Sequence, residues 1–167
     1  MITRLSGEEL QAARKRAAER FTAIALSYVP EGWAVKYRTS LSGRCWYDRK
    51  LIDGPKPVTR KSLYIFLHEC AHAHLHAPLY FQSKSAYRRK PKHVIELEAE
   101  QWAHAKMREH DVPVPKAMTA RAKAYVGRKI RKAEKRGAKH IDPAARKFAG
   151  RKRAALAAIN TFVEDET

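Results

Sequence analysis

The longest apolar stretch of the chain lies near its middle, over residues 62–76. Apolar side chains occupy nearly every direction around a helix here, which predicts a helix that is buried on almost all sides. These side chains are Leu63, Ile65, Phe66, Leu67, Ala71, Ala73 and Leu75. Pro78 predicts the end of this helix, and residues 79–92 have the composition of a connecting loop. Residues 93–105 again combine apolar and small side chains at helical spacing, so they predict a second helix that packs closely against the first.

The first part of the chain predicts a helix followed by a small sheet. Ser6 and Glu9 have the spacing of a capping box at the start of a long amphipathic helix. Residues 33–38 alternate apolar and basic side chains, and this run and residues 44–52 predict two strands. The Ser-Leu-Ser-Gly segment at residues 40–43 predicts a hairpin connection between them. Helices and strands in this order indicate an α+β fold.

A proline-containing segment at residues 111–115 divides the chain. Residues 1–115 are long enough to form one domain with a core of its own. Residues 116–167 are a basic extension, in which helices are predicted at about residues 119–136 and 142–160. The sequence therefore predicts one α+β domain with a helical C-terminal extension.

The charge of the chain is concentrated in this extension. The net charge is +18, from 35 Lys and Arg against 17 Asp and Glu, and residues 116–153 hold fifteen of the basic residues with two acids. Such a block attracts polyanions, because phosphates neutralised by Lys and Arg release their counterions. We therefore expect contact with DNA or RNA through residues 116–153. The alternative is a solvated basic helix pair that covers the core or binds an acidic partner.

The small number of cysteines and the lack of a signal-peptide pattern both favour a cytoplasmic protein. The two cysteines, Cys45 and Cys70, are too few for a disulfide framework. No opening stretch has the form of a signal peptide, and no apolar run reaches about 18 residues. We therefore expect a cytoplasmic location and no membrane partner, and we expect Cys70 to face the core.

Candidate chemistry lies in the first buried helix, in the sequence His-Glu-Cys-Ala-His at residues 68–72. His68 and His72 are one helical turn apart on the same face, so both imidazoles can bind one metal ion. Glu69 projects beside that face, where the glutamate of H-E-x-x-H proteins acts on a water molecule and does not bind the metal. The predicted metal is Zn²⁺, with Mn²⁺ as the alternative.

A hydrolytic zinc site requires a third protein ligand. The predicted ligand is Glu98, on the second buried helix. Its neighbours Glu96 and Glu100 are expected to point elsewhere, because each residue turns a helix by about 100°. At most one of the three glutamates should therefore face the ion, and Glu96, Glu100 and His93 are the alternatives to Glu98. His76, one turn beyond the histidine pair, is expected to support the site without touching the ion.

The motif at residues 68–72, followed by Glu-Leu-Glu-Ala-Glu-Gln-Trp-Ala at residues 96–103, resembles the ImmA/IrrE-type zinc metallopeptidases, a gluzincin-like family. In that family the H-E-x-x-H helix precedes a helix of the form E-x-E-A-N-x-F-A, from which a Glu completes the metal site. Glu100 and Trp102 depart from the Asn and Phe of this pattern. The resemblance covers about residues 20–115 and implies a zincin-like fold that hydrolyses a protein substrate.

A second group, the SprT/Spartan-like DNA-repair proteases, shares the H-E-x-x-H motif but takes its third ligand from a later His. His93 is the residue that could fill this role, and it lacks the Gly that follows the His in that group. In zincins, a strand beside the metal helix usually offers its edge to the substrate. The resemblance implies that residues 44–52 serve this purpose.

The predicted function is therefore zinc-dependent peptide hydrolysis, with Glu69 as the catalytic base and a protein substrate near nucleic acid. The alternative is a nucleic-acid-binding accessory protein of a mobile element, with a structural zinc site that cleaves nothing. A fourth protein ligand such as His76 or His104 would favour that alternative. An interaction module without metal is the third hypothesis.

Overall fold

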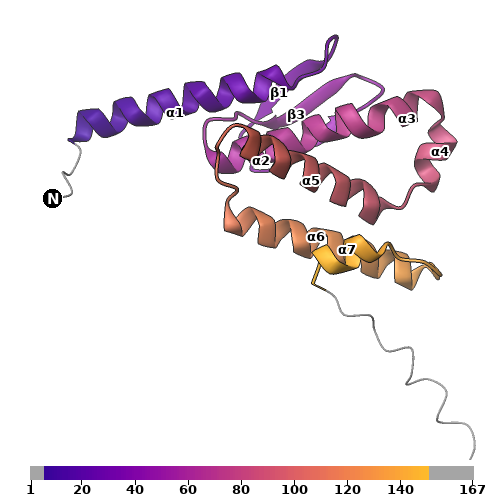
Figure 1. The fold of residues 1–167 in the computed structure, drawn as a ribbon. Coiled ribbons are helices and arrows are strands. Elements are labelled where there is room, and N and C mark those ends of the chain that lie inside the picture. The colour runs from indigo at the N-terminus through magenta and orange to yellow at the C-terminus, as the bar shows by residue number, and fades with distance from the viewer. Residues whose placement is uncertain (1–5, 151–167) are drawn as a thin grey trace, which may run out of the picture.

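The computed structural model describes residues 6–150 and has an α+β fold, as the sequence predicts (Figure 1). An N-terminal helix precedes a three-stranded sheet, and a succession of helices follows. The elements are α1 (Gly7–Ser27), β1 (Ala34–Arg38), β2 (Arg44–Trp46), β3 (Leu51–Pro55), α2 (Arg60–Ala71), the π-helical turn η1 (His72–His76), α3 (Ala77–Gln82), α4 (Lys84–Arg89), α5 (Lys92–Glu109), α6 (Lys116–Lys135) and α7 (Pro143–Phe148).

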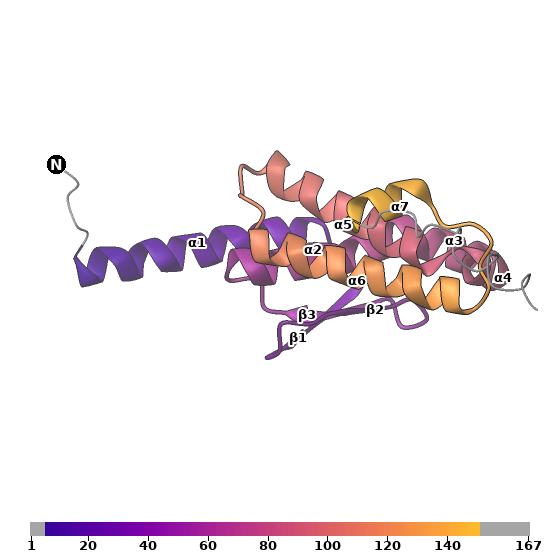
Figure 2. The same cartoon turned by 90° about the horizontal axis from the view of Figure 1, so that it is seen from below.

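Helix α1 begins with the predicted capping box. The Ser6 hydroxyl accepts a hydrogen bond from the Glu9 amide, and the Glu9 carboxylate accepts one from the Ser6 amide. Two residues of α1, Ile24 and Ala25, are buried. The first turns of the helix therefore project beyond the rest of the molecule, as both views show (Figures 1 and 2).

The sheet has the strand order β1-β3-β2, which differs from the predicted hairpin. The run at residues 44–52 is not one strand, because the charged residues 48–50 form a turn in which Lys50 adopts a φ of 46°. Its two halves, β2 and β3, pair with each other in antiparallel fashion, and β1 pairs with β3 in parallel. Strand β2 is therefore an edge strand of the sheet.

Helix α2 forms the centre of the core. Thr59 and Ser62 build its capping box, and the buried side chains of Leu63, Phe66 and Leu67 confirm the predicted burial. Cys70 is also fully buried, as expected.

The helical course does not end at Pro78. It passes from α2 through η1 into α3, and Pro78 lies in the first turn of α3, where no intrahelical partner for its missing N–H is required. The predicted loop at residues 79–92 consists largely of the short helices α3 and α4.

Helix α5 packs against α2 through small side chains, since Ala99 and Ala103 are completely buried. On its other side α5 meets α6 and α7 in a second apolar cluster, built from Leu97, Val126, Ile130 and Ala145. Helix α6 consequently lies alongside α5 (Figures 1 and 2).

The first predicted helix of the extension is present as α6, whereas the second, α7, ends at Phe148, just before Gly150 with its φ of 67°, and is shorter than predicted. Gly137, with a φ of 80°, follows the end of α6, and α7 begins with Asp142 as its cap and Pro143 in its first turn. Residues 151–160 of the predicted second helix lie outside the described residues. None of the helices in the described part of the chain is both long and apolar enough to cross a lipid bilayer.

An ion pair between a partly exposed arginine and a buried aspartate fixes the loop between β1 and β2. Asp53 of β3 accepts hydrogen bonds from Arg38 Nε at 3.0 Å and Nη2 at 2.5 Å, and Arg38 Nη1 donates to the Ser42 hydroxyl at 3.1 Å. The hydrogen bonds from Arg38 lower the pKa of Asp53 below its usual value. Gly43, which follows Ser42, is thereby held in place.

We expect Asp53→Asn to lower the midpoint of thermal unfolding at neutral pH by about 2–6 °C, because the charge-assisted hydrogen bonds are lost. Because the pKa of Asp53 is lowered in the folded protein, its stabilising effect is present above the unfolded pKa, which is about 4. The effect is lost as the pH falls through the folded value. Unfolding followed by circular dichroism should therefore show the two proteins converging below about pH 4. An unchanged difference in acid would contradict this account.

Candidate metal centre

His68 lies in the last turn of α2 and His72 is the first residue of η1, one turn further on, and their Nε2 atoms are 3.1 Å from each other. Glu96 of α5 faces them, with its Oε2 atom 3.5 Å from His68 Nε2 and 3.7 Å from His72 Nε2. Ligand atoms on a tetrahedral zinc ion lie about 3.3 Å apart, given bond lengths of about 2.0–2.1 Å. The spacing of these three side chains is close to that value, so the group could hold a metal ion.

The acidic residue at the histidine pair is Glu96, and not the predicted Glu98. Glu98 lies on another face of α5, where its Oε2 atom accepts hydrogen bonds from Lys90 Nζ at 2.6 Å and His76 Nε2 at 2.8 Å. Its side chain is 34% exposed. The third position of the group therefore moves from Glu98 to Glu96.

His93, the other candidate ligand, takes part in a structural contact. Its side chain is buried, and its Nε2 atom accepts a hydrogen bond of 3.2 Å from the backbone amide of Asp142. Asp142 is the cap of α7, so His93 joins α5 to the start of that helix.

Glu100 lies one turn beyond Glu96 and also faces the histidine pair. Its Oε1 atom is 3.2 Å from His68 Nδ1, and its other oxygen accepts a hydrogen bond from the Tyr64 hydroxyl. Burial raises the pKa of Glu100 to about 8. His104 Nε2 lies 3.3 Å from the same tyrosine hydroxyl. These residues form a polar chain behind His68.

Sequence reasoning missed Tyr64 and Glu100. The available signal was their spacing. Tyr64 precedes His68 by four residues and Glu100 follows Glu96 by four, so each shares a helix face with a residue of the metal group.

A second polar chain lies behind His72. His72 Nδ1 is 3.0 Å from His76 Nδ1, and the other ring nitrogen of His76 contacts Glu98. His76 is completely buried and belongs to η1, the π-helical turn that directly follows α2. This position agrees with the expectation that His76 supports the site from behind. Partners on the far ring nitrogen fix the orientation of a metal-binding imidazole.

The two histidines differ in their affinity for protons. Burial opposes a charge on His68, but the pKa of His68 is raised because the carboxylates of Glu96 and Glu69 face it. Burial and the positive charges of His68 and His76 hold the pKa of His72 well below its usual value. His72 is therefore neutral at pH 7, which is the form that binds a metal.

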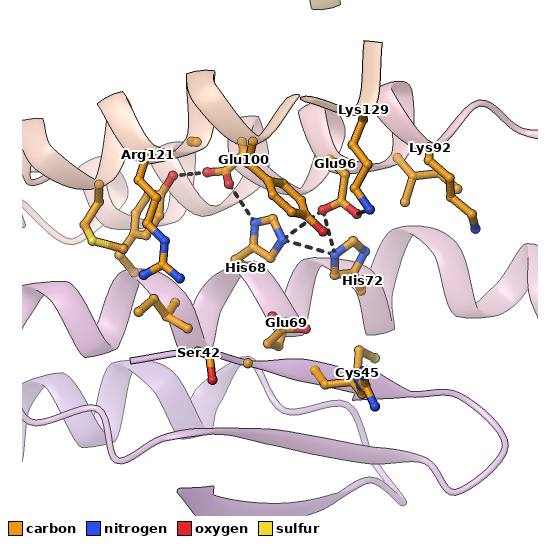
Figure 3. Close-up of a pocket in the computed structure, with 18 of the residues that line it drawn as sticks. Ser42, Cys45, His68, Glu69, His72, Lys92, Glu96, Glu100, Arg121 and Lys129 are labelled. Carbon is orange, nitrogen blue, oxygen red and sulfur yellow. Dashed lines mark hydrogen bonds and ion pairs between the residues drawn. The ribbon is translucent and has the colours of Figure 1, made fainter. Parts of the chain in front are cut away.

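Glu69 lies between the histidine pair and strand β2 (Figure 3). Its side chain is almost fully buried, and burial, with the neighbouring charge of Glu96, raises its pKa to about 7. Gly43 contacts it so closely that a Cβ atom on Gly43 would lie 2.5 Å from Glu69 Cγ and 2.6 Å from Glu69 Oε1. Only a glycine leaves room for the carboxylate in this place.

We expect Gly43→Ala to displace the Glu69 carboxylate and to lower any Glu69-dependent turnover by about 100-fold. Metal content should not change, because no ligand is touched. The matched control is Gly7→Ala, at a position where an added Cβ meets nothing within 4 Å. Full turnover by the Gly43 variant, measured beside metal content and thermal stability, would show that the position of Glu69 does not depend on Gly43.

These side chains line a cavity of about 500 Å³. Helix α2 forms its floor, β2 and the preceding loop form one wall, and α5 and α6 form the other (Figure 3). The residues that α6 contributes are Met118, Arg121, Ala122, Tyr125, Arg128 and Lys129. The basic extension is therefore part of the wall of this cavity.

Three of the four predicted site residues, His68, Glu69 and His72, line this cavity, and Glu98 lies behind it. Two imidazoles and a carboxylate can bind a cation, and Glu69, a second carboxylate with a pKa near neutrality, can exchange a proton beside it. No protein-family model, curated protein or solved structure matches this chain.

Proposed function

We propose that this protein is a zinc-dependent metallopeptidase. The observation that carries the proposal is the convergence of His68, His72 and Glu96 in a cavity that Glu69 also lines. Two histidines with one glutamate are a ligand set of catalytic zinc sites in hydrolases.

The number of ligands supports a catalytic site over a structural one. Structural zinc sites are closed by four protein ligands, whereas catalytic sites keep one position for water or substrate. Among the described residues, the metal group has three members. His76 and His104, the candidates for a fourth ligand, are instead engaged with His72 and Tyr64.

Zinc bound at this group would act as a Lewis acid that polarises the scissile carbonyl and lowers the pKa of a water molecule. Glu69 accepts the proton of the attacking water and passes it to the nitrogen of the leaving amine. The walls of the cavity hold the substrate beside this carboxylate. The outer edge of β2 offers backbone hydrogen bonds to an extended peptide, a mode of binding that requires no particular substrate sequence.

The direct test combines metal analysis with a cleavage assay on the full chain. We expect about one zinc per chain, cleavage of an unstructured protein such as casein, loss of cleavage after chelation, and recovery when zinc or manganese is added back. A zinc-loaded protein that cleaves neither casein nor a mixed peptide library would overturn the proposal.

The second candidate is a nucleic-acid-binding protein with a structural zinc site. It is favoured by the exposed basic side chains of α6, among them Lys123, Arg131 and Lys132. X-ray absorption spectra of the zinc-loaded protein separate the two candidates. Four protein ligands and no water support the structural site, and three protein ligands with a water support the peptidase.

A further inference from the structure

We infer that the cavity selects acidic peptides, with carboxylate side chains on both sides of the bond that is cleaved. The inference extends the proposed peptidase function, and its statement about the cleaved bond rests on that function. Its physical basis, the charge of the cavity wall, is independent of turnover.

The cavity is lined by more cations than carboxylates. The cations are Arg44, Lys92, Arg121, Arg128 and Lys129, and the carboxylates are Glu69, Glu96 and Glu100. Two of the carboxylates already have partners. Glu96 lies 3.8 Å from Lys129 Nζ and beside the two imidazoles, and Glu100 contacts Tyr64 and His68. The surplus positive charge therefore comes from the other cations.

Three of these cations are held in place by neutral groups. Arg121 donates a hydrogen bond of 3.0 Å to the Leu41 carbonyl, Arg128 lies over the ring of Tyr125, and Lys92 lies over the ring of Tyr87. Within residues 6–150, none of the three forms an ion pair with a carboxylate. Their charges are positioned without a direct ion pair, and a concave wall concentrates the field of such charges on a ligand.

The cations stand at the two ends of the cavity. Arg121 lies at one end and Lys92 at the other, with the histidine pair between them (Figure 3). Along α6, Arg121 and Arg128 are separated by about 10 Å, from seven residues with a rise of about 1.5 Å each. An extended peptide covers that distance in about three residues. Arg121 and Arg128 therefore match two acidic residues about three positions apart, and Arg121 and Lys92 place positive charge on either side of the scissile bond.

The surroundings of these cations favour a peptide over a nucleic acid. The carboxylate of Glu96 lies at the histidine pair in the same cavity, where it would repel a continuous chain of phosphates, whereas a peptide brings only two separate charges. The edge of β2 along one wall also pairs with a peptide backbone and has no counterpart in a nucleic acid.

The test measures binding without turnover. The full-length Glu69→Gln protein is titrated against fluorescent peptides of one sequence that carry, at two positions three apart, Glu, Gln or Lys. Fluorescence anisotropy should show the Glu peptide binding about 10-fold more tightly than the Gln peptide and the Lys peptide most weakly, with the differences shrinking at high salt. Equal affinity for the Glu and Gln peptides would overturn the inference.

Substitutions on α6 locate the effect. Arg121→Gln and Arg128→Gln, each made in the Glu69→Gln protein, should weaken binding of the Glu peptide by about 3–10-fold and leave the Gln peptide unchanged. The matched control is Arg131→Gln, an exposed arginine of the same helix that does not line the cavity. An equal loss with Arg131→Gln would assign the effect to the general charge of the protein and would contradict the inference.

Two further readouts decide between the explanations. A duplex or single-stranded oligonucleotide that displaces the Glu peptide with higher affinity at physiological salt would assign the cations to nucleic acid and overturn the inference. Selective binding of the Glu peptide by a protein that cleaves nothing would leave the inference standing and remove the peptidase proposal. Cleavage without any preference for acidic peptides would overturn the inference and leave the peptidase proposal standing.

Discussion

Glu69→Gln is expected to reduce peptide cleavage by at least about 1,000-fold while the protein keeps its metal. A carboxamide of the same shape fills the space against Gly43 but cannot accept a proton from water, and general base catalysis contributes about 10²–10⁴ to a rate. The metal group is untouched, because Glu69 is not one of its three members. The measurement is kcat on a cleaved peptide, with zinc content determined on the same sample.

The control for this experiment is Glu98→Gln, which removes a carboxylate from the same region but from behind the cavity. It should lower kcat far less than the Glu69 substitution does. Retained cleavage by the Glu69→Gln protein at full zinc content would exclude Glu69 as the base and, with it, the mechanism proposed above.

Glu96→Gln is expected to weaken zinc binding by about 1,000-fold or more, because a neutral amide replaces the anionic ligand of the group. Glu98→Gln should weaken it by about 10–100-fold, since Glu98 acts on His72 only through His76. The two substituted residues lie two positions apart on the same helix, and both substitutions remove one negative charge. Competition for zinc with a chromophoric chelator measures both affinities.

A larger loss with Glu98→Gln than with Glu96→Gln would contradict the arrangement described for α5. Circular dichroism of both metal-free variants provides the control for folding. If both variants bind zinc as tightly as the original protein, the two histidines hold the ion without help from α5, and the candidate site loses its third member.

The sequence predicted the metal helix well because its signals are local. The apolar run and His68 lie in α2, and His72 follows four residues later as the first residue of η1, which continues the same helical course. No long-range information is required to place two side chains on the same face of a helix. The same reasoning placed Cys70 in the core.

The position of Glu96 beside the histidine pair was not predicted, because the rotation of α5 about its axis depends on packing against two neighbours. Ile95, Ala99 and Ala103 are buried in the main body of the molecule, whereas Leu97 is buried against α6 and α7. A helix that is apolar on two sides gives an ambiguous prediction of which face meets the metal. The four-residue spacing of Glu96 and Glu100 was the better guide, because it places both carboxylates on one face of the helix.

The sheet order depends on contacts between distant segments. The parallel pairing of β1 with β3 joins residues that lie about 17 positions apart, as Val35 with Ile52. The sequence signal for a hairpin at residues 40–43 is local and was overridden. Likewise, the amphipathic pattern of α6 predicted a helix with one apolar side but contained no information on which surface that side would cover.

The metal group and the cations of the cavity belong to different helices, and this division has a consequence for redesign. The members of the metal group come from α2, η1 and α5, while Arg121 and Arg128 come from α6, which is anchored by the apolar side chains of Val126 and Ile130. The exposed residues of α6 can therefore be substituted without changing either its apolar anchor or the three members of the metal group. Exchanging Arg121 and Arg128 for glutamates should therefore reverse the charge of this wall. The inferred preference for acidic peptides would then become a preference for basic ones, while Glu69 and the metal group keep their sequence and their place.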